Sequence, residues 1–170
     1  MRPPRQIATR PLGPDLAVGP EDRYLEDYPV GGVFEYGDRL VTASEIVEFA
    51  MAFDPQDFHV DQDSAAAGPF GGLIASGFHT NALAMRLLAD HYLSWVASLG
   101  SPGFDALSWP APVRPGDRLR LRTTVLEVRP SASKPDRGVL RTAIELRTDQ
   151  GVVVMATTIT NLLRRRPAAG

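Results

Sequence analysis

The chain has 170 residues, 44% of them hydrophobic, a formal net charge of −2 at pH 7 and no cysteine. That length supports one domain with a sizeable core and is too short for two ordinary domains. The charge gives no general attraction to nucleic acid or to an anionic membrane, so neither is expected as a partner. The lack of cysteine excludes disulfides, thiolate nucleophiles and cysteine-based zinc sites, which leaves Asp, Glu, His, Ser, Thr, Tyr and Lys for catalysis.

The first 22 residues are rich in Pro, Gly and Arg and lack a hydrophobic period, which predicts an irregular arm that, if ordered, lies across a partner subunit. They contain no apolar segment of the kind that a secretory signal needs, so a cytoplasmic location is expected. The longest apolar stretch, residues 73–99, contains Arg86, Asp90 and His91. It is therefore expected to be a buried helix and not a membrane span.

Residues 33–41 are predicted to form the first strand, because apolar and aromatic residues follow a Gly-Gly turn. Thr42 and Glu45 then match a capping box, in which the Thr side chain caps the helix and the Glu reaches back. The apolar positions that follow predict a short helix ending near Phe53.

Pro55 disfavours helical geometry at the residue before it and has no N–H to donate. Residues 54–59 are therefore predicted to lie on a constrained loop. Asp61 or Asp63 is expected to cap a second short helix over residues 64–67.

The long helix is expected to begin near Gly77 and to run for roughly 20 residues, about 30 Å at the α-helical rise. Its apolar residues follow steps of three and four, and the same helix places His91 on the surface. The stripe consists of Phe78, Ala82, Met85, Ala89, Tyr92 and Val96. A surface this broad requires a large cover, and a curved sheet is the natural candidate.

The remaining residues supply that sheet, since alternating apolar and polar positions have the period of a half-exposed strand. A turn signal at 148–151 predicts a hairpin between the last two strands. The end of the chain, 164–170, is predicted to be a frayed tail. Strands are expected over residues 107–113, 119–128, 139–147 and 152–163.

Asp54 and His59 are five positions apart and could face one small cavity. A carboxylate and an imidazole together can hold a water, remove its proton and return a proton to carbon. The alternative is that Asp54 caps backbone N–H groups and His59 is a packing residue. The pair alone does not decide between the two.

Gly77 falls at the expected start of the long helix, where unpaired N–H groups and the positive end of the helix dipole point outward. A backbone N–H there can stabilise a developing oxyanion, and the missing side chain lets a carbonyl approach. The alternative is that Gly77 only permits close packing of the helix on the sheet.

Three motifs occur in a fixed order: FDPQDFHVD, PFGGLIASGFHT and PVRPGD. Together they resemble the MaoC-like dehydratases, the R-specific enoyl-CoA hydratases of the hotdog superfamily. The resemblance runs from about Val33 to Leu163. It implies an α+β hotdog fold, in which a curved antiparallel sheet wraps a long central helix, with one domain over residues 23–163 that forms a homodimer or a dimer of dimers.

The resemblance also implies reversible hydration of an enoyl thioester carried on coenzyme A or acyl carrier protein, with no metal and no other cofactor. The catalytic Asp and His fall on Asp54 and His59, and the glycine whose N–H polarises the thioester carbonyl falls on Gly77. The neighbouring positions expected to bind substrate are Gln56, Asp57, Phe58, Phe70, Ser76 and His79.

The chain departs from the family pattern Asp-x-Asn-Pro-x-His, because Gln56 and Asp57 replace the Asn and the Pro. A second carboxylate at Asp57 would raise the pKa of Asp54 if the two were close. A serine that several hydratases carry later in the helix falls on Met85. Two alternatives therefore stay open: a thioesterase that uses Asp54 or Asp57 to direct water at the carbonyl, and a non-catalytic acyl-thioester binding protein.

Other polar residues carry weaker signals. His79 and His91 are 12 positions apart, more than three helical turns, so one metal ion cannot easily meet both. Arg114, Lys134 and Arg137 could meet the phosphates of coenzyme A, although loop arginines are more often solvated.

Overall fold

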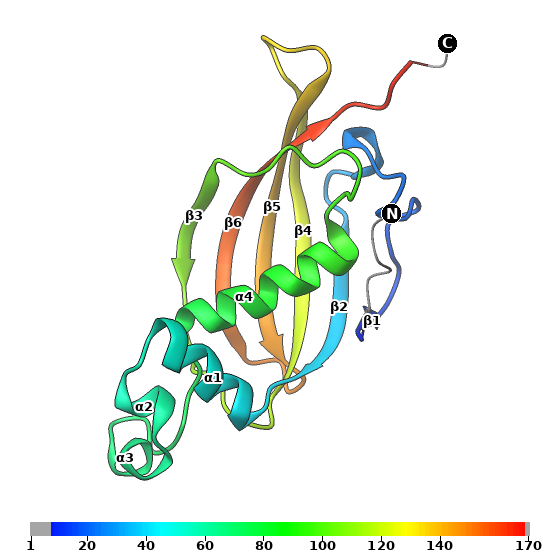
Figure 1. Ribbon diagram of the computed structural model, residues 1–170. Coiled ribbons are helices and arrows are strands. Elements are labelled where there is room, and N and C mark those ends of the chain that lie inside the picture. Colours follow the sequence, from blue (N-terminus) through cyan, green and yellow to red (C-terminus); the bar gives the residue numbers. More distant parts are fainter. Residues whose placement is uncertain (1–7, 169–170) are drawn as a thin grey trace, which may run out of the picture.

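The computed structural model describes residues 8–168; residues 1–7 and 169–170, which belong to the predicted arm and tail, lie outside it. One curved antiparallel sheet wraps a central helix, with three short helices beside the start of that helix (Figure 1). The strand order across the sheet is β1-β2-β4-β5-β6-β3. The strands are β1 (Arg10–Pro11), β2 (Val33–Leu40), β3 (Gly103–Ser108), β4 (Arg118–Pro130), β5 (Arg137–Thr148) and β6 (Val153–Arg164).

The middle of the sheet follows the predicted alternation. Along β5, buried residues alternate with partly exposed ones over the whole strand, so one face packs on the helix and the other faces outward. Leu140, Ile144 and Leu146 lie on the packed face and are at most 2% exposed. The predicted hairpin joins β5 to β6, and Gly151 N–H donates to Thr148 O at 2.9 Å within it.

The central helix is shorter than the 20 residues expected. It consists of α4 (Gly77–Leu87) and a π-helical turn, η2 (Leu88–Tyr92), which together make 16 residues. Arg23, which is fully buried, donates to the carbonyl oxygens of His91 and Tyr92 at 2.7 Å each. The helix ends here because a guanidinium group satisfies its last carbonyls and complements the negative end of its dipole.

Local capping signals mark where two of the three short helices begin. In α1 (Ala43–Phe53), Thr42 accepts the Glu45 N–H as predicted, while the Glu45 carboxylate binds Arg39 instead of closing the capping box. Asp61 is the N-cap of α3 (Gln62–Ala67), one of the two caps expected. Between them lies α2 (Asp57–Val60).

Three expectations about individual segments are wrong. The loop predicted over residues 54–59 is shorter, because residues 57–60 form the helix α2, whose first turn is stabilised by the negative charge of Asp57. The strand expected over residues 107–113 is instead β3, which ends at Ser108 before the prolines. His91 is not on the surface but stacks on Tyr36 at 5.0 Å, because the π turn directs it inward.

Parts of the predicted arm and tail contact the same chain. Arg10 and Pro11 pair with β2, and Leu16 is buried in the core. Arg165 and Arg166 bind acidic residues of the segment around η1 (Leu25–Asp27), such as Glu26 at 2.9 Å from Arg165. Described parts of both segments are therefore held on the domain that they flank.

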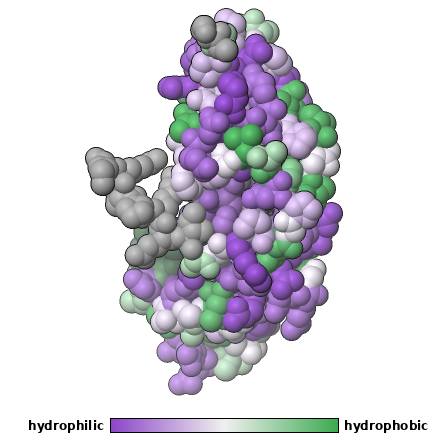
Figure 2. All heavy atoms as spheres, turned by 90° about the vertical axis from the view of Figure 1, so that its right-hand side faces the viewer, coloured by the Kyte–Doolittle hydropathy of each residue, from purple (hydrophilic) through white to green (hydrophobic). Residues whose placement is uncertain are grey.

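The sheet edge that carries β1 and β2 presents mainly hydrophilic side chains, with apolar ones scattered among them (Figure 2). Larger exposed apolar side chains cluster elsewhere, near the start of α4 and on β3, where Phe53 is 75%, Phe78 66% and Phe104 51% exposed. Within residues 8–168, no helix is both long and apolar enough to cross a lipid bilayer.

Candidate active site

A pocket of about 340 Å³ lies where α2, the start of α4 and the segment after β3 meet. Phe58 and His59 of α2 form one side, and Gly77 and Thr80 of α4 form another. The remaining wall is mostly apolar and consists of Phe70, Ile74, Ala75, Trp109, Pro110, Ala111, Pro112 and Val113. We call it the helix-start pocket.

Backbone hydrogen bonds fix the walls of this pocket. Ala75 N–H donates to Val113 O at 2.8 Å, and Ile74 N–H donates to Phe58 O at 3.2 Å. Arg114, which follows Val113 in the PVRPGD motif, donates from Nη2 to Phe70 O at 2.7 Å. Hydrogen bonds therefore connect the three sequence motifs around the pocket, although the PVRPGD motif lies more than 30 residues after the other two in the chain.

Asp54 is the C-cap that follows α1, and two side chains donate to its carboxylate. Gln56 Nε2 donates to Oδ1 and the Ser76 hydroxyl donates to Oδ2, each at 2.7 Å. The hydrogen bond from Ser76, and next that from Gln56, lowers the pKa of Asp54 below its ordinary value of 3.8. The carboxylate is therefore ionised at neutral pH, and the rise expected from Asp57 does not dominate its pKa.

His59 is 4% exposed and its ring is oriented by the backbone. Its Nδ1 lies 2.7 Å from Ile74 O, and a carbonyl oxygen can only accept, so Nδ1 carries the proton. In the neutral ring Nε2 is then the basic nitrogen. The orientation therefore directs the proton-accepting atom at Asp54.

His59 Nε2 and Asp54 Oδ2 lie 3.4 Å apart. Two acceptors at that separation repel each other unless a proton lies between them or a water donates one hydrogen to each. The geometry thus suits a bound water that both groups orient. It can also hold a proton that passes between water and the pair.

Gly77 is the first residue of α4, and within the described residues no acceptor takes its N–H. This N–H lies at the positive end of the helix dipole, where a developing negative charge is stabilised. Gly77 is also closely packed, because a Cβ added there would lie 2.8 Å from Trp109 Cε2. Both explanations for a glycine at this position therefore have a structural basis.

The structure divides the six expected substrate-binding residues into groups. Phe58 and Phe70 line the pocket. Gln56 and Ser76 contact Asp54 instead, and Ser76 is fully buried. Asp57 is exposed on the first turn of α2.

His79 lies away from the helix-start pocket, although it is only two residues beyond Gly77. Its ring stacks on Phe49 of α1 at 4.7 Å, and its Nδ1 is buried without a hydrogen-bond partner among the described residues. Burial lowers the pKa of His79 below its ordinary value of 6.5, and Glu45 opposes this effect. His79 is thus a neutral packing residue between two helices.

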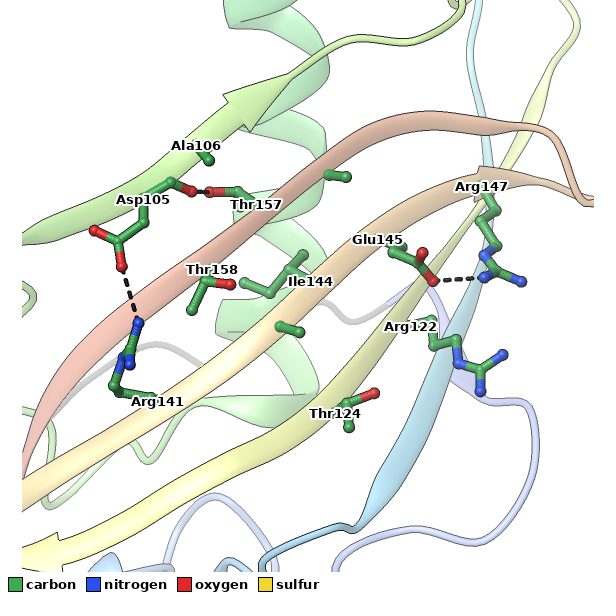
Figure 3. Close-up of a pocket in the computed structure, with 12 residues that line it drawn as sticks. Asp105, Ala106, Arg122, Thr124, Arg141, Ile144, Glu145, Arg147, Thr157 and Thr158 are labelled. Atoms are coloured by element: carbon green, nitrogen blue, oxygen red, sulfur yellow. Dashed lines mark hydrogen bonds and ion pairs between the residues drawn. The ribbon is translucent and has the colours of Figure 1, made fainter.

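A larger cavity, about 560 Å³, lies on the face of the sheet away from α4, and we call it the outer pocket (Figure 3). Four of its charged side chains form two ion pairs: Arg141 binds Asp105 at 3.0 Å, and Arg147 binds Glu145. Arg122 is 3.9 Å from Glu35. The cavity contains several charges but no histidine and no helix start.

The donors for a metal ion are dispersed. In the part of the chain that the structure describes, no group of three or more His, Asp or Glu side chains is arranged to hold a metal ion. His59 faces Asp54, while His79 and His91 stack on Phe49 and Tyr36. Of the basic residues considered for phosphate binding, Arg137 binds Asp136 and Lys134 lies on the loop between β4 and β5.

Sequence reasoning missed Trp109, which covers Gly77 and forms part of the pocket wall. The sequence also did not indicate that Ser76 and Gln56 donate hydrogen bonds to the Asp54 carboxylate. The PVRPGD motif gave a partial signal for this wall, since Val113 binds the segment that leads into α4. The contact between Trp109 and Gly77 depends on how the end of β3 meets α4, which no local pattern records.

Comparisons with known proteins agree with the fold. The family model described as MaoC like domain matches residues 28–145. The crystal structure of the MaoC-like dehydratase from Rhodospirillum rubrum is 42% identical, with a TM-score of 0.77, and the match covers 85% of this chain and 99% of that one.

Two relatives in sequence extend the comparison. The uncharacterized protein YdeM of Bacillus subtilis is 28% identical over 141 residues, which cover 83% of this chain and 99% of the relative. The 3-hydroxyacyl-thioester dehydratase Z of Mycobacterium tuberculosis is 36% identical over 108 residues, 62% of this chain and 72% of the relative.

Proposed function

Because the chain belongs to the MaoC-like domain family, with the hotdog fold of that family, we propose that it adds water reversibly to an enoyl thioester. The observation that carries the proposal is the arrangement of three groups at the helix-start pocket. His59 and Gly77 line it, and Asp54 lies 3.4 Å from His59. The name of the Mycobacterium tuberculosis relative, a 3-hydroxyacyl-thioester dehydratase, supports the same reaction class.

In the hydration direction, the thioester carbonyl accepts the Gly77 N–H, which draws electrons from the double bond and makes the β-carbon electrophilic. Water held by Asp54 and His59 attacks that carbon, and a C–O bond forms while an O–H bond of the water breaks. The proton passes to the acid/base pair, and the electron pair of the double bond moves to the thioester oxygen.

The enolate then collapses. Its electron pair forms a C–H bond at the α-carbon with a proton from the pair, and the thioester carbonyl is restored. The net change is the addition of one water, with no redox step. Dehydration follows the same path in reverse, with the pair acting first as base and then as acid.

The apolar walls of the pocket favour an acyl thioester as the substrate class. Phe58, Phe70 and Trp109 place three aromatic rings beside His59 and Gly77, and such surfaces bury hydrocarbon. The carrier is either coenzyme A or acyl carrier protein. Parallel assays with crotonyl thioesters of both carriers distinguish them.

We further propose that the working unit is a homodimer, which could pair again into a dimer of dimers. β3 is the last strand of the sheet, and Phe104 on it is 51% exposed. Phe53 and Phe78 expose 75% and 66% of their surface near the helix-start pocket. Large apolar side chains of this kind suit an interface, and light scattering after gel filtration measures the mass directly.

The direct test is turnover of crotonyl-CoA and longer enoyl-CoAs, followed as loss of the enoyl absorbance. The proposal predicts loss of that absorbance with formation of the 3-hydroxyacyl thioester. Hydrolysis also removes the conjugated thioester absorbance, so release of free CoA thiol together with the unsaturated free acid identifies a thioesterase instead. Tight binding without any product identifies a non-catalytic acyl-thioester binding protein.

A further inference from the structure

One hydroxyl group connects the two halves of the proposed site. Ser76 precedes Gly77 and is the N-cap of α4, where its Oγ accepts the Phe78 N–H at 3.2 Å. The same hydroxyl donates its proton to Asp54 Oδ2 at 2.7 Å. A single side chain therefore contacts both the helix that presents Gly77 N–H and the carboxylate that faces His59.

Ser76 has no means to bind substrate itself. Its side chain is fully buried, and it does not line the helix-start pocket. Its one donated proton goes to Asp54, and its oxygen already accepts from the backbone. The expectation that Ser76 contacts substrate is thus replaced by a role that acts through another residue.

Two donors hold the Asp54 carboxylate from different sides. Gln56 fixes Oδ1 from the segment before α2, and Ser76 fixes Oδ2 from the start of α4. Oδ2 is also the oxygen that faces His59 Nε2 at 3.4 Å. Without the Ser76 hydroxyl, rotation of the carboxylate would change the distance between the catalytic carboxylate oxygen and the imidazole.

We propose that Ser76 is a positioning residue that holds Asp54 Oδ2 at a fixed distance from the Gly77 N–H. The water held by Asp54 and the carbonyl held by Gly77 are then at the right separation to react. This inference rests on the proposed hydratase function. Reacting groups need near-attack geometry, and a displacement of about 1 Å can cost about 100-fold in rate. Ser76 would hold that geometry because it belongs to the same helix turn as Gly77.

The electrostatics of Asp54 are consistent with this role. Of the groups around it, Ser76 makes the largest contribution to its lowered pKa, followed by Gln56. His59 is the titratable group that faces it, from α2, and it lowers the pKa by a smaller amount. Removal of the Ser76 hydroxyl is therefore expected to raise the pKa of the Asp54 carboxyl.

The test compares Ser76→Ala with Thr42→Ala. Both changes remove an N-cap hydroxyl that accepts a backbone N–H at 3.2 Å, but Thr42 caps α1 and does not contact Asp54. Ser76→Ala is expected to lower kcat for crotonyl-CoA hydration about 10- to 100-fold with KM changed less than about threefold. Thr42→Ala is expected to keep kcat within about twofold, since only a cap is lost.

Two further variants keep the test decisive if Ser76→Ala does not fold. Ser76→Thr retains the hydroxyl donor and is expected to restore most of kcat. Ser76→Cys retains nearly the side-chain volume but donates weakly, so it is expected to resemble Ser76→Ala in kcat. A circular dichroism melt of each variant establishes that it is folded.

A second readout does not depend on turnover. Carbon-13 NMR titration of the Asp54 carboxyl in Ser76→Ala, or in Ser76→Cys, is expected to give a higher pKa than in the wild type, while Thr42→Ala leaves it unchanged. An unchanged Asp54 pKa overturns the role of Ser76 whatever the kinetic result. An increase in KM with unchanged kcat also overturns it, because that identifies a substrate contact. A wild type that hydrates no thioester overturns the proposed function, while the titration still decides whether Ser76 controls Asp54.

Discussion

The outer pocket is lined by several charged side chains that pair with one another, whereas the helix-start pocket is lined by one imidazole, His59, with the Asp54 carboxylate 3.4 Å from it. In the outer pocket the charges neutralise one another, as Arg141 does with Asp105 and Arg147 with Glu145 (Figure 3). At the helix-start pocket, hydrogen bonds hold the His59 imidazole and the neighbouring Asp54 carboxylate in place, and the Gly77 N–H stays free of an acceptor within the described residues. The larger cavity with more charges is thus the weaker candidate, because polar groups that remain available to a ligand mark a site better than charge does.

The largest loss of activity is expected when the proton-transfer groups at the helix-start pocket are removed. Asp54→Asn and His59→Gln keep the shape of the side chains but remove a negative charge and a titratable nitrogen. Loss of a positioned general acid or base costs about 10²- to 10⁴-fold, so kcat for crotonyl-CoA hydration is expected to fall by that amount in each variant. Full rate in both variants would contradict the assignment.

Gly77→Ala tests the oxyanion position and is expected to lower kcat by about 100-fold, close to the effect of losing one oxyanion donor. The new Cβ would hinder the approach of the carbonyl and collide with Trp109. The double variant Gly77→Ala/Trp109→Ala separates these causes. Recovery of thermal stability without recovery of kcat supports a role in catalysis, whereas kcat restored to that of Trp109→Ala alone shows that Gly77 serves packing only.

His79 and His59 are both buried, but only His59 lines the helix-start pocket. Substitution of His79 is therefore expected to change the thermal stability of the protein and not kcat. Burial lowers the pKa of His79 below its ordinary value of 6.5. As the pH is lowered from 6.5 towards the pKa of the folded state, the unfolded chain binds a proton that the folded chain does not, so the free energy of unfolding decreases. His79→Leu removes this penalty along with an Nδ1 that has no hydrogen-bond partner among residues 8–168. Melting curves at pH 7 and pH 5 are expected to show a smaller loss of Tm in the variant, and an equal loss would contradict a neutral, buried His79.

The smallest effect is expected in the outer pocket. Arg141→Gln breaks an ion pair whose side chains are 40% and 67% exposed, and such surface pairs contribute about 0–1 kcal/mol. Hydration of crotonyl-CoA is expected to change less than about twofold. A loss comparable with that of His59→Gln would reverse the comparison and place the reaction on the other face of the sheet.

The sequence predicted features that depend on neighbours along the chain. Thr42 and Asp61 cap the helices at which they were expected, and the alternating strands and their hairpin are present. The order of motifs also predicted the family and the wrapped central helix. The caps, strands and hairpin are signalled by spacings of a few residues, which local backbone geometry converts directly into structure, whereas the family rests on a resemblance of the motifs.

The features that the sequence did not predict depend on long-range contacts. No local pattern marks Arg23, which directly follows the predicted arm, yet it caps the end of the central helix from 68 positions away. His91 reads as a surface residue because the π turn that rotates it inward has no local signature. Ser76 was expected to bind substrate, and only the fold reveals that its hydroxyl reaches Asp54, 22 positions earlier.

Turnover of crotonyl-CoA in oxygen-18 labelled water, with mass spectrometry of the products, tests the central claim most directly. The account predicts that the label enters the 3-hydroxyl group of an intact thioester in the wild type and that this product is lost in Asp54→Asn and His59→Gln. Label found instead in the carboxylate of a free acid, or in no product at all, would contradict the assignment of Asp54, His59 and Gly77 to the hydration of an enoyl thioester.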